Sequence, residues 1–114
     1  MMVILRADDG KILTSLPLAE GSDGAIFNPA TMEAYSTHGN GTLTIVKETS
    51  PTTFEVEQTL NTMNFARTIA FDPTTNHIFT MADEKGPPPP TPPGGRAGRG
   101  ASIPGTFTIL MIGK

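Results

Sequence analysis

The sequence predicts an all-β fold of the β-propeller type, with about two four-stranded blades per chain and a ring completed by oligomerisation. Two observations lead to this prediction. Residues 25–35 return as residues 69–79, with Phe27 and Phe71 in equivalent places and an offset of 44 residues. One such period also contains four short strand-like segments separated by turn residues. A repeat of about 40–45 residues built from short strands is typical of a propeller blade and is longer than a leucine-rich or ankyrin repeat.

Residues 21–64 are predicted to form one complete blade of four antiparallel strands. The first, 25–28, ends at Asn-Pro, because proline cannot donate to a sheet and asparagine favours a turn. The second, 33–38, is closed by Gly-Asn-Gly, whose residues accept the positive φ angles of a tight hairpin. The third, 42–47, is rich in β-branched residues, which suit a pleated surface. The fourth, 54–60, carries glutamates typical of a solvated edge strand.

Residues 1–20 are expected to supply the third and fourth strands of a partial blade. These strands are placed at 2–6 and 11–17, and they are joined by a hairpin turn at Asp8-Asp9-Gly10. The second of them aligns with residues 56–60 at the same 44-residue offset. The segment before residue 7 is apolar but too short for a signal peptide, and no cellular compartment is predicted.

Residues 65–114 are expected to supply the first three strands of a second blade, at 68–72, 77–82 and 106–112. A proline- and glycine-rich insert at 85–104 separates the last two of these strands. Polyproline has no backbone N–H donors, and glycine-rich sequence is flexible, so the insert should not join a sheet ladder. We expect a protruding and partly disordered loop.

Three segments resemble the YVTN-type β-propeller repeat proteins of bacteria: 41–46, 66–73 and 105–114. Residues 35–38 and 79–82 stand where the Tyr-Val-Thr-Asn motif of that family lies. The resemblance implies a propeller fold and places the chain as about two repeats from the C-terminal part of such a protein. Members of the family usually carry seven blades and are often exported.

The composition limits the classes of partner. Only 37% of the residues are hydrophobic and there is no tryptophan, so part of the core is expected to come from neighbouring chains. A net charge of −3 argues against nucleic acid, whose phosphates require a basic surface. No apolar stretch approaches the roughly 20 residues needed to cross a membrane. The absence of cysteine excludes disulfides and thiolate metal sites.

The predicted partner is therefore a further copy of the same chain. An isolated pair of blades would expose two apolar outer faces, which association would cover. The fourth strand at 11–17 of one chain could complete the blade that begins at residue 68 of the next. Two blades per chain allow six blades in a homotrimer or eight in a homotetramer, and the trimer is preferred.

No catalytic, cofactor-binding or metal-binding residue is predicted. The histidines, His38 and His77, do not occupy equivalent repeat positions and are expected to line turns or the surface. Asp23 and Arg67 do occupy equivalent positions, just before the innermost strands, where propeller loops face the channel mouth. They are candidate channel-mouth contacts, and the alternative is that they pair with each other. The inter-blade core is assigned to the large apolar residues Phe27, Tyr35, Leu43, Phe71, Phe79 and Phe107.

The function predicted first is a binding or interaction scaffold, because propellers present loops around a channel and no catalytic set is visible. A propeller-type enzyme, such as a lactonase or a quinoprotein, is the alternative and would need converging carboxylates or metal ligands. A gene fragment that only self-assembles is the third possibility.

Overall fold

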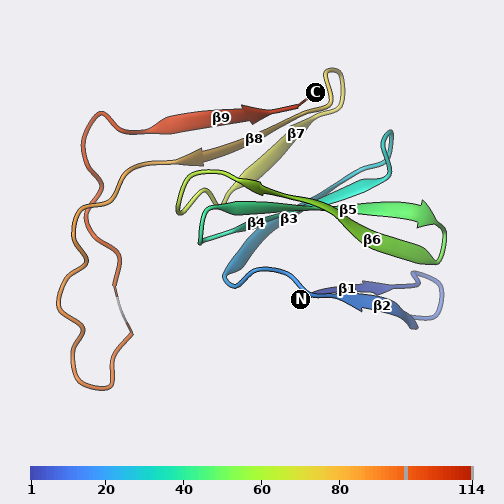
Figure 1. Cartoon of the computed structure of the whole chain (residues 1–114), viewed down its shortest axis with the longest axis horizontal. Coiled ribbons are helices and arrows are strands. Elements are labelled where there is room, and N and C mark those ends of the chain that lie inside the picture. The colour runs from blue at the N-terminus through green and yellow to red at the C-terminus, as the bar shows by residue number, and fades with distance from the viewer. Residues whose placement is uncertain (97, 114) are drawn as a thin grey trace.

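The computed structural model describes residues 1–96 and 98–113. Within them the chain forms nine strands, arranged in three antiparallel sheets (Figure 1). The strands are β1 (Met2–Leu5), β2 (Ile12–Leu16), β3 (Ser22–Asn28), β4 (Glu33–His38), β5 (Thr42–Ser50), β6 (Thr53–Asn61), β7 (Ile69–Asp72), β8 (His77–Ala82) and β9 (Thr108–Ile112). The described part contains no helix, and the all-β prediction is confirmed.

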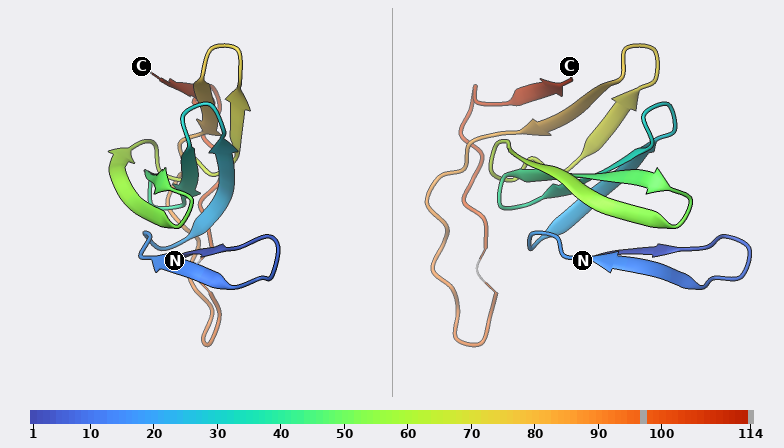
Figure 2. Two further views of the ribbon diagram at one scale, coloured as in Figure 1. Left: turned by 90° about the vertical axis from the view of Figure 1, so that its right-hand side faces the viewer. Right: turned by 45° about the vertical axis from the view of Figure 1, so that its right-hand side comes forward.

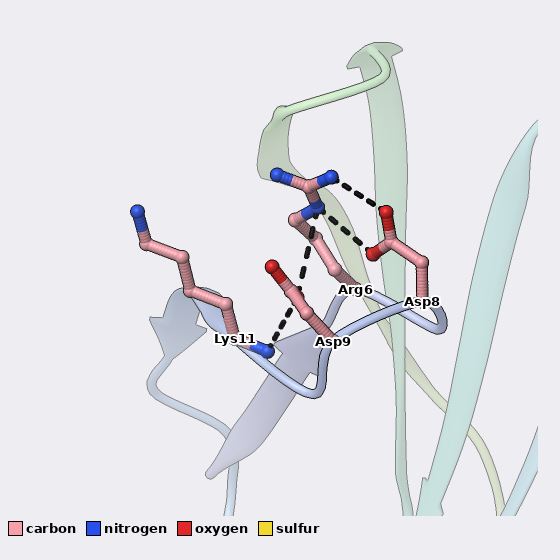
Figure 3. A network of polar contacts seen from close by, with 4 residues as sticks. All are labelled: Arg6, Asp8, Asp9 and Lys11. Carbon is pink, nitrogen blue, oxygen red and sulfur yellow. Dashed lines mark hydrogen bonds and ion pairs between the residues drawn. The ribbon is translucent and has the colours of Figure 1, made fainter.

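The first sheet is a hairpin of β1 and β2, joined at the turn predicted around Gly10. Arg6 bonds to the Asp8 carboxylate through Nη2 at 2.6 Å and Nε at 3.1 Å, and the Lys11 amide donates to Asp9 Oδ1 at 2.9 Å (Figure 3). The hydrogen bond from Arg6 lowers the pKa of Asp8. These groups are exposed, so the network fixes the turn more than it stabilises the fold.

The second sheet contains four strands in the order β3-β4-β5-β6, each paired with its sequence neighbour. Tyr35 in the second of these strands lies between Ile26 and Ile45 of the flanking strands. The β4–β5 turn needs glycine at Gly41, where φ is +88° and an added Cβ would lie 2.7 Å from Asn64 Oδ1. The four strands predicted within 21–64 are present, although β3 begins earlier, at Ser22, and β5 continues to Ser50.

The third sheet has the order β7-β8-β9, although a long loop separates its last two strands. Ile78 is paired with Ile112 across that loop. The expectation that residues 85–104 take no part in a ladder is wrong at the base of the loop, where Lys85 and Ser102 form a bridge. The Gly86 amide also donates to the Ala101 carbonyl at 2.8 Å. The ladder stops at residue 87 because the prolines that follow have no N–H to donate.

The three sheets form an open stack, with the four-stranded sheet between the other two (Figures 1 and 2). The first sheet contacts the second through β2 and β6, and the second contacts the third through β3 and β7. The radius of gyration is 16.4 Å. A compact domain of this length would have about 13 Å, so the stack leaves more surface open than a closed globule does.

The core lies mainly between the second and third sheets. Its buried members are Tyr35, Leu43, Ile45 and Ile78, and partly buried apolar residues pack around them: Ile26, Leu60, Ile69, Phe71 and Ile112. Leu43 has no exposed surface, whereas Ile78 retains 2%. The strand β4 is buried on both faces because it is central in its sheet and the sheet is covered on both sides.

We predict that Leu43→Ala lowers the free energy of unfolding by about 2–5 kcal/mol, because it removes a fully buried side chain and leaves a cavity. The measurement is urea unfolding followed by circular dichroism. Val56→Ala is the control, since Val56 on the outer strand is 40% exposed and should cost less than about 1 kcal/mol. Equal losses in the two variants would contradict the core assignment.

We also predict that replacing residues 86–101 by Asn-Gly preserves the third sheet, because the pair Lys85 and Ser102 already faces across the base of the loop. Shortening the loop reduces the entropy cost of its closure, and the expected gain in stability is of the order of 1 kcal/mol. Urea unfolding of the shortened chain measures the gain. Loss of the folded far-ultraviolet spectrum would show that the insert is needed for the fold.

Candidate functional site

The six residues predicted to form the inter-blade core do not share one environment. Tyr35 and Leu43 are buried, and Phe71 and Phe79 are partly buried. Phe27 and Phe107 lie outside the core of the single chain and are 46% and 64% exposed, so their assignment to an inter-blade core stays a prediction. Side chains alternate across a strand, so where Ile26 of β3 faces inward, its neighbour Phe27 faces the opposite side.

The outward face of the third sheet is apolar. Phe107, Ile109 and Met111 are each more than 60% exposed, and Met81 is 37% exposed. Met81 lies directly opposite Ile109 in the β8–β9 pairing, so their side chains stand on the same face of the sheet. The other face of the same strands carries Ile78 and Ile112, which pack in the core.

The first sheet has a matching outward face. Val3, Leu5 and Ile12 are between 43% and 60% exposed, and Leu5 is paired with Ile12. The two apolar faces lie at opposite ends of the stack, as the positions of β1–β2 and β7–β9 show in Figures 1 and 2. We call them the N-terminal face (Val3, Leu5, Ile12) and the C-terminal face (Met81, Phe107, Ile109, Met111).

Arg67 lies against the β4–β5 turn. An added Cβ on Gly39 would be 2.9 Å from Arg67 Nη2, so glycine makes room for the guanidinium. The Arg67 carbonyl accepts a hydrogen bond from the Thr37 hydroxyl, which itself accepts one from the Gly24 amide at 3.1 Å. Arg67 Nε is buried without a hydrogen-bond partner in the described part of the chain. The arginine therefore fastens the segment before β7 to the second sheet.

Asp23, the other candidate channel-mouth residue, is exposed on β3. None of the ion pairs found among the described residues joins Asp23 to Arg67. The pairing considered from the sequence is thus not formed within this chain.

His38 ends β4 beside the β4–β5 turn, as one of its two expected positions has it, but its side chain is fully buried, so the expected surface position is wrong. Its Nδ1 lies 3.1 Å from Ser22 Oγ and its Nε2 lies 3.0 Å from Thr44 Oγ1, in a link from β3 through β4 to β5. Burial lowers the pKa of His38 and favours the neutral ring. Because both ring nitrogens have hydroxyl partners, the residue is structural. The residues 1–96 and 98–113 hold no group of three or more metal-ligating side chains.

A cavity of about 410 Å³ lies between the second and third sheets. Its polar wall includes Glu33 and Tyr35, and its apolar wall includes Ile45, Ile78 and Ile112. The Tyr35 hydroxyl donates to Glu33 Oε2, and Lys47 Nζ lies 3.9 Å from Oε1 of the same carboxylate. Burial, with a contribution from this hydrogen bond, raises the pKa of Tyr35 to about 12.

Lys47 also donates to the Thr31 carbonyl, so the cluster that it forms with Glu33 and Tyr35 contains an internally compensated charge pair. Asn28 Nδ2 donates to Asn76 Oδ1 at 3.3 Å and so links the second sheet to the third. The cluster explains how a carboxylate is tolerated in the core, and it offers no activated nucleophile. Sequence reasoning missed it, although Glu33 and Tyr35 are two residues apart on a predicted strand and so share a face.

The comparisons with known proteins give no match: no protein family, no curated protein and no solved structure matches the chain. The resemblance to the YVTN-type repeat proteins therefore stays a prediction. The described residues include no helix long and apolar enough to cross a membrane.

We predict that the stability of the protein falls as the pH drops below about 6.5 because His38 is buried in its neutral form. The folded-state pKa is lowered, so in this range the unfolded chain binds a proton that the folded chain does not. The contribution of His38 to the free energy of unfolding is fully present above about pH 6.5, and it declines by at most about 1.4 kcal/mol per pH unit as the pH falls. Urea unfolding at several pH values measures it.

In that experiment His38→Gln should reduce the pH dependence, whatever its effect on stability at pH 7. The Val56→Ala variant controls for mutation elsewhere and should keep the pH dependence of the original chain, since its side chain does not ionise. An unchanged slope in His38→Gln would show that His38 does not titrate as its burial requires.

Proposed function

We propose that this chain is a β-propeller repeat protein that acts as a binding or interaction scaffold and assembles with further copies of itself into a ring. The sheets would be the blades. The proposal rests on one observation above all, the two apolar faces at opposite ends of the stack.

The contacts between the sheets support the assignment of blades. β3 and β7 are both first strands of the repeat, and they lie side by side. β2 and β6 are both fourth strands, and they also lie side by side. Equivalent strands meet in this way when successive blades are rotated about a common axis, with first strands inside and fourth strands outside.

The chemistry of the end faces favours a second copy as the partner. The end faces belong to sheets of the same repeat as the sheet packed between them. If the third sheet of one copy and the first sheet of the next form one shared blade, each end face would lie against the second sheet of the other copy and continue the stacking that already joins the sheets inside the chain. Exposed apolar patches of this kind mark interaction sites, and repeat proteins bury a continuous core by stacking.

Free strand edges allow this shared blade to form. In the described sheets β2 pairs only with β1, and β9 pairs only with β8. A shared sheet would form if β2 of one copy aligned with β9 of the next. Two repeats per copy would give six blades in a homotrimer, which we prefer, or eight in a homotetramer.

A propeller-type enzyme would need a set of converging acid, base or metal-ligating groups. In the described residues the buried Glu33 is paired with Tyr35 and Lys47, and His38 is held by two hydroxyls. We therefore place binding ahead of catalysis.

We predict that the chain has a mass in solution of three or four times the 12.0 kDa of a single copy, measured by light scattering after gel filtration. Leu5→Glu on the N-terminal face or Ile109→Glu on the C-terminal face should each prevent the ring from closing, because a charge would be buried at the contact. Thr52→Glu in the exposed β5–β6 turn is the matched control and should leave the mass unchanged.

A mixture of the Leu5→Glu and Ile109→Glu variants tests the head-to-tail arrangement directly. Each variant keeps one intact face, so the mixture should form a dimer that neither variant forms alone. A folded monomer of the original chain at all concentrations would overturn the proposal. If Leu5→Glu by itself stayed a dimer, the C-terminal face would pair with its own copy and the ring would be excluded.

A further inference from the structure

The insert displays a short polyproline segment to solvent. Residues 87–93 contain six prolines and one threonine, and all seven are exposed. The segment belongs to the long loop that extends away from the three sheets on the β8–β9 side (Figure 1). The proline rings are not covered by any of the three sheets.

The conformation of the segment is set by its own sequence. Each proline holds φ near −65°, and a residue that precedes proline is pushed into the extended region. Residues 86–89, 91 and 92 each precede a proline, and residue 90 is itself a proline, so the segment favours a polyproline II helix. At about 3.1 Å per residue it would be roughly 20 Å long.

Both ends of the segment are defined by the structure. Lys85 Nζ lies 2.6 Å from Asp83 Oδ1 and donates to Ser102 Oγ at 2.7 Å, which ties the two limbs of the loop together. The hydrogen bond from Lys85 lowers the pKa of Asp83 and so keeps this carboxylate charged. At the far end, Gly94 has a φ of +74° and the Gly95 amide donates to the Pro92 carbonyl at 2.9 Å, so a turn ends the helix.

The returning limb is also attached. The Arg99 guanidinium lies over the Phe65 ring, 5.3 Å from its centroid, which is a cation–π contact. The loop is thus held at its base and along its return, where Pro89 lies near Gly98 and Pro92 near Gly95, while all of residues 87–93 stay exposed. A peptide that is already extended and tethered loses little conformational entropy on binding.

We propose that residues 87–93 are a docking peptide for a protein domain that binds polyproline helices in a groove lined by aromatic side chains. Such grooves take the flat proline rings of successive helical turns. The exposed Arg96, three residues after the last proline, would favour a groove with an acidic rim. The chain has no tryptophan and only 6% aromatic residues, so a groove of this kind is expected on another protein. This site is independent of the two end faces.

The test uses the full chain and three kinds of isolated domain, SH3, WW and EVH1, chosen with a tryptophan in the groove. Because the chain itself contains no tryptophan, any change in tryptophan emission reports the groove of the added domain. We expect a saturable change with at least one domain, and competition by a free polyproline peptide. Raising the salt concentration should weaken binding of the original chain, because salt screens the attraction between Arg96 and an acidic rim. The same change in salt should weaken binding of Arg96→Ala less.

Two variants decide whether the prolines carry the binding. Replacement of Pro88, Pro89 and Pro92 together by alanine should weaken binding at least tenfold, with unchanged circular dichroism. Thr91→Ala, which leaves every proline in place, is the matched control and should bind within about twofold of the original chain.

The proposal is overturned if none of the three domains gives a saturable signal, or if the triple proline variant binds as well as the original chain. A change in the solution mass of the triple variant would also overturn it, because the segment would then hold copies of this chain together. The solution mass of the original chain tests only the proposed ring, and the tryptophan signal tests only the docking peptide. Either proposal can therefore be overturned without the other.

Discussion

The structure depends on the packing of one apolar sheet against the next. A strand such as β4 is buried on both of its faces, and this burial is possible only because the second sheet has a neighbour on each side. The hydrophobic gain is roughly proportional to the apolar area removed from water. A sheet with a neighbour on one side only can bury only one of its two faces. The repeat is therefore stable only when its sheets are stacked.

Because the second sheet is covered on both sides, some of its polar side chains are buried. Once buried, these side chains need hydrogen-bond partners within the protein. His38 is satisfied by Ser22 and Thr44, and Glu33 by Tyr35 with Lys47 nearby. Each set joins neighbouring strands or turns, so the polar bonds also fix how the strands lie. Buried groups that lack a partner cost about 1–3 kcal/mol, which explains why these side chains occur in linked sets.

The same constraint separates two kinds of surface. The end faces are apolar because they repeat the faces that are covered inside the stack, so their chemistry suits a further sheet. The polyproline segment is excluded from any sheet, since it lacks N–H donors, and it is held away from the sheets by Lys85 and its partners. The scaffold and the loop can therefore contact different partners without competing for the same residues.

The sequence by itself determined where the strands lie and how the hairpins turn, because both depend on local chemistry. Gly41 and the Asp8-Asp9-Gly10 turn are recognisable from residue type alone, and the 44-residue offset aligns strands that local propensity would leave uncertain. Strand ends shifted where a partner strand extended them: β5 continues to Ser50 because Thr53 is paired with it across the turn.

Which face of each strand is covered was decided only by the tertiary structure. Alternation shows that Ile26 and Phe27 point to opposite sides, but only the position of the third sheet decides that Ile26 is partly buried while Phe27 stays 46% exposed. The surface position expected for His38 is wrong for the same reason, since a strand covered on both sides buries polar residues that a half-buried strand would expose. Local sequence fixes which residues share a face, and long-range packing fixes which face meets water.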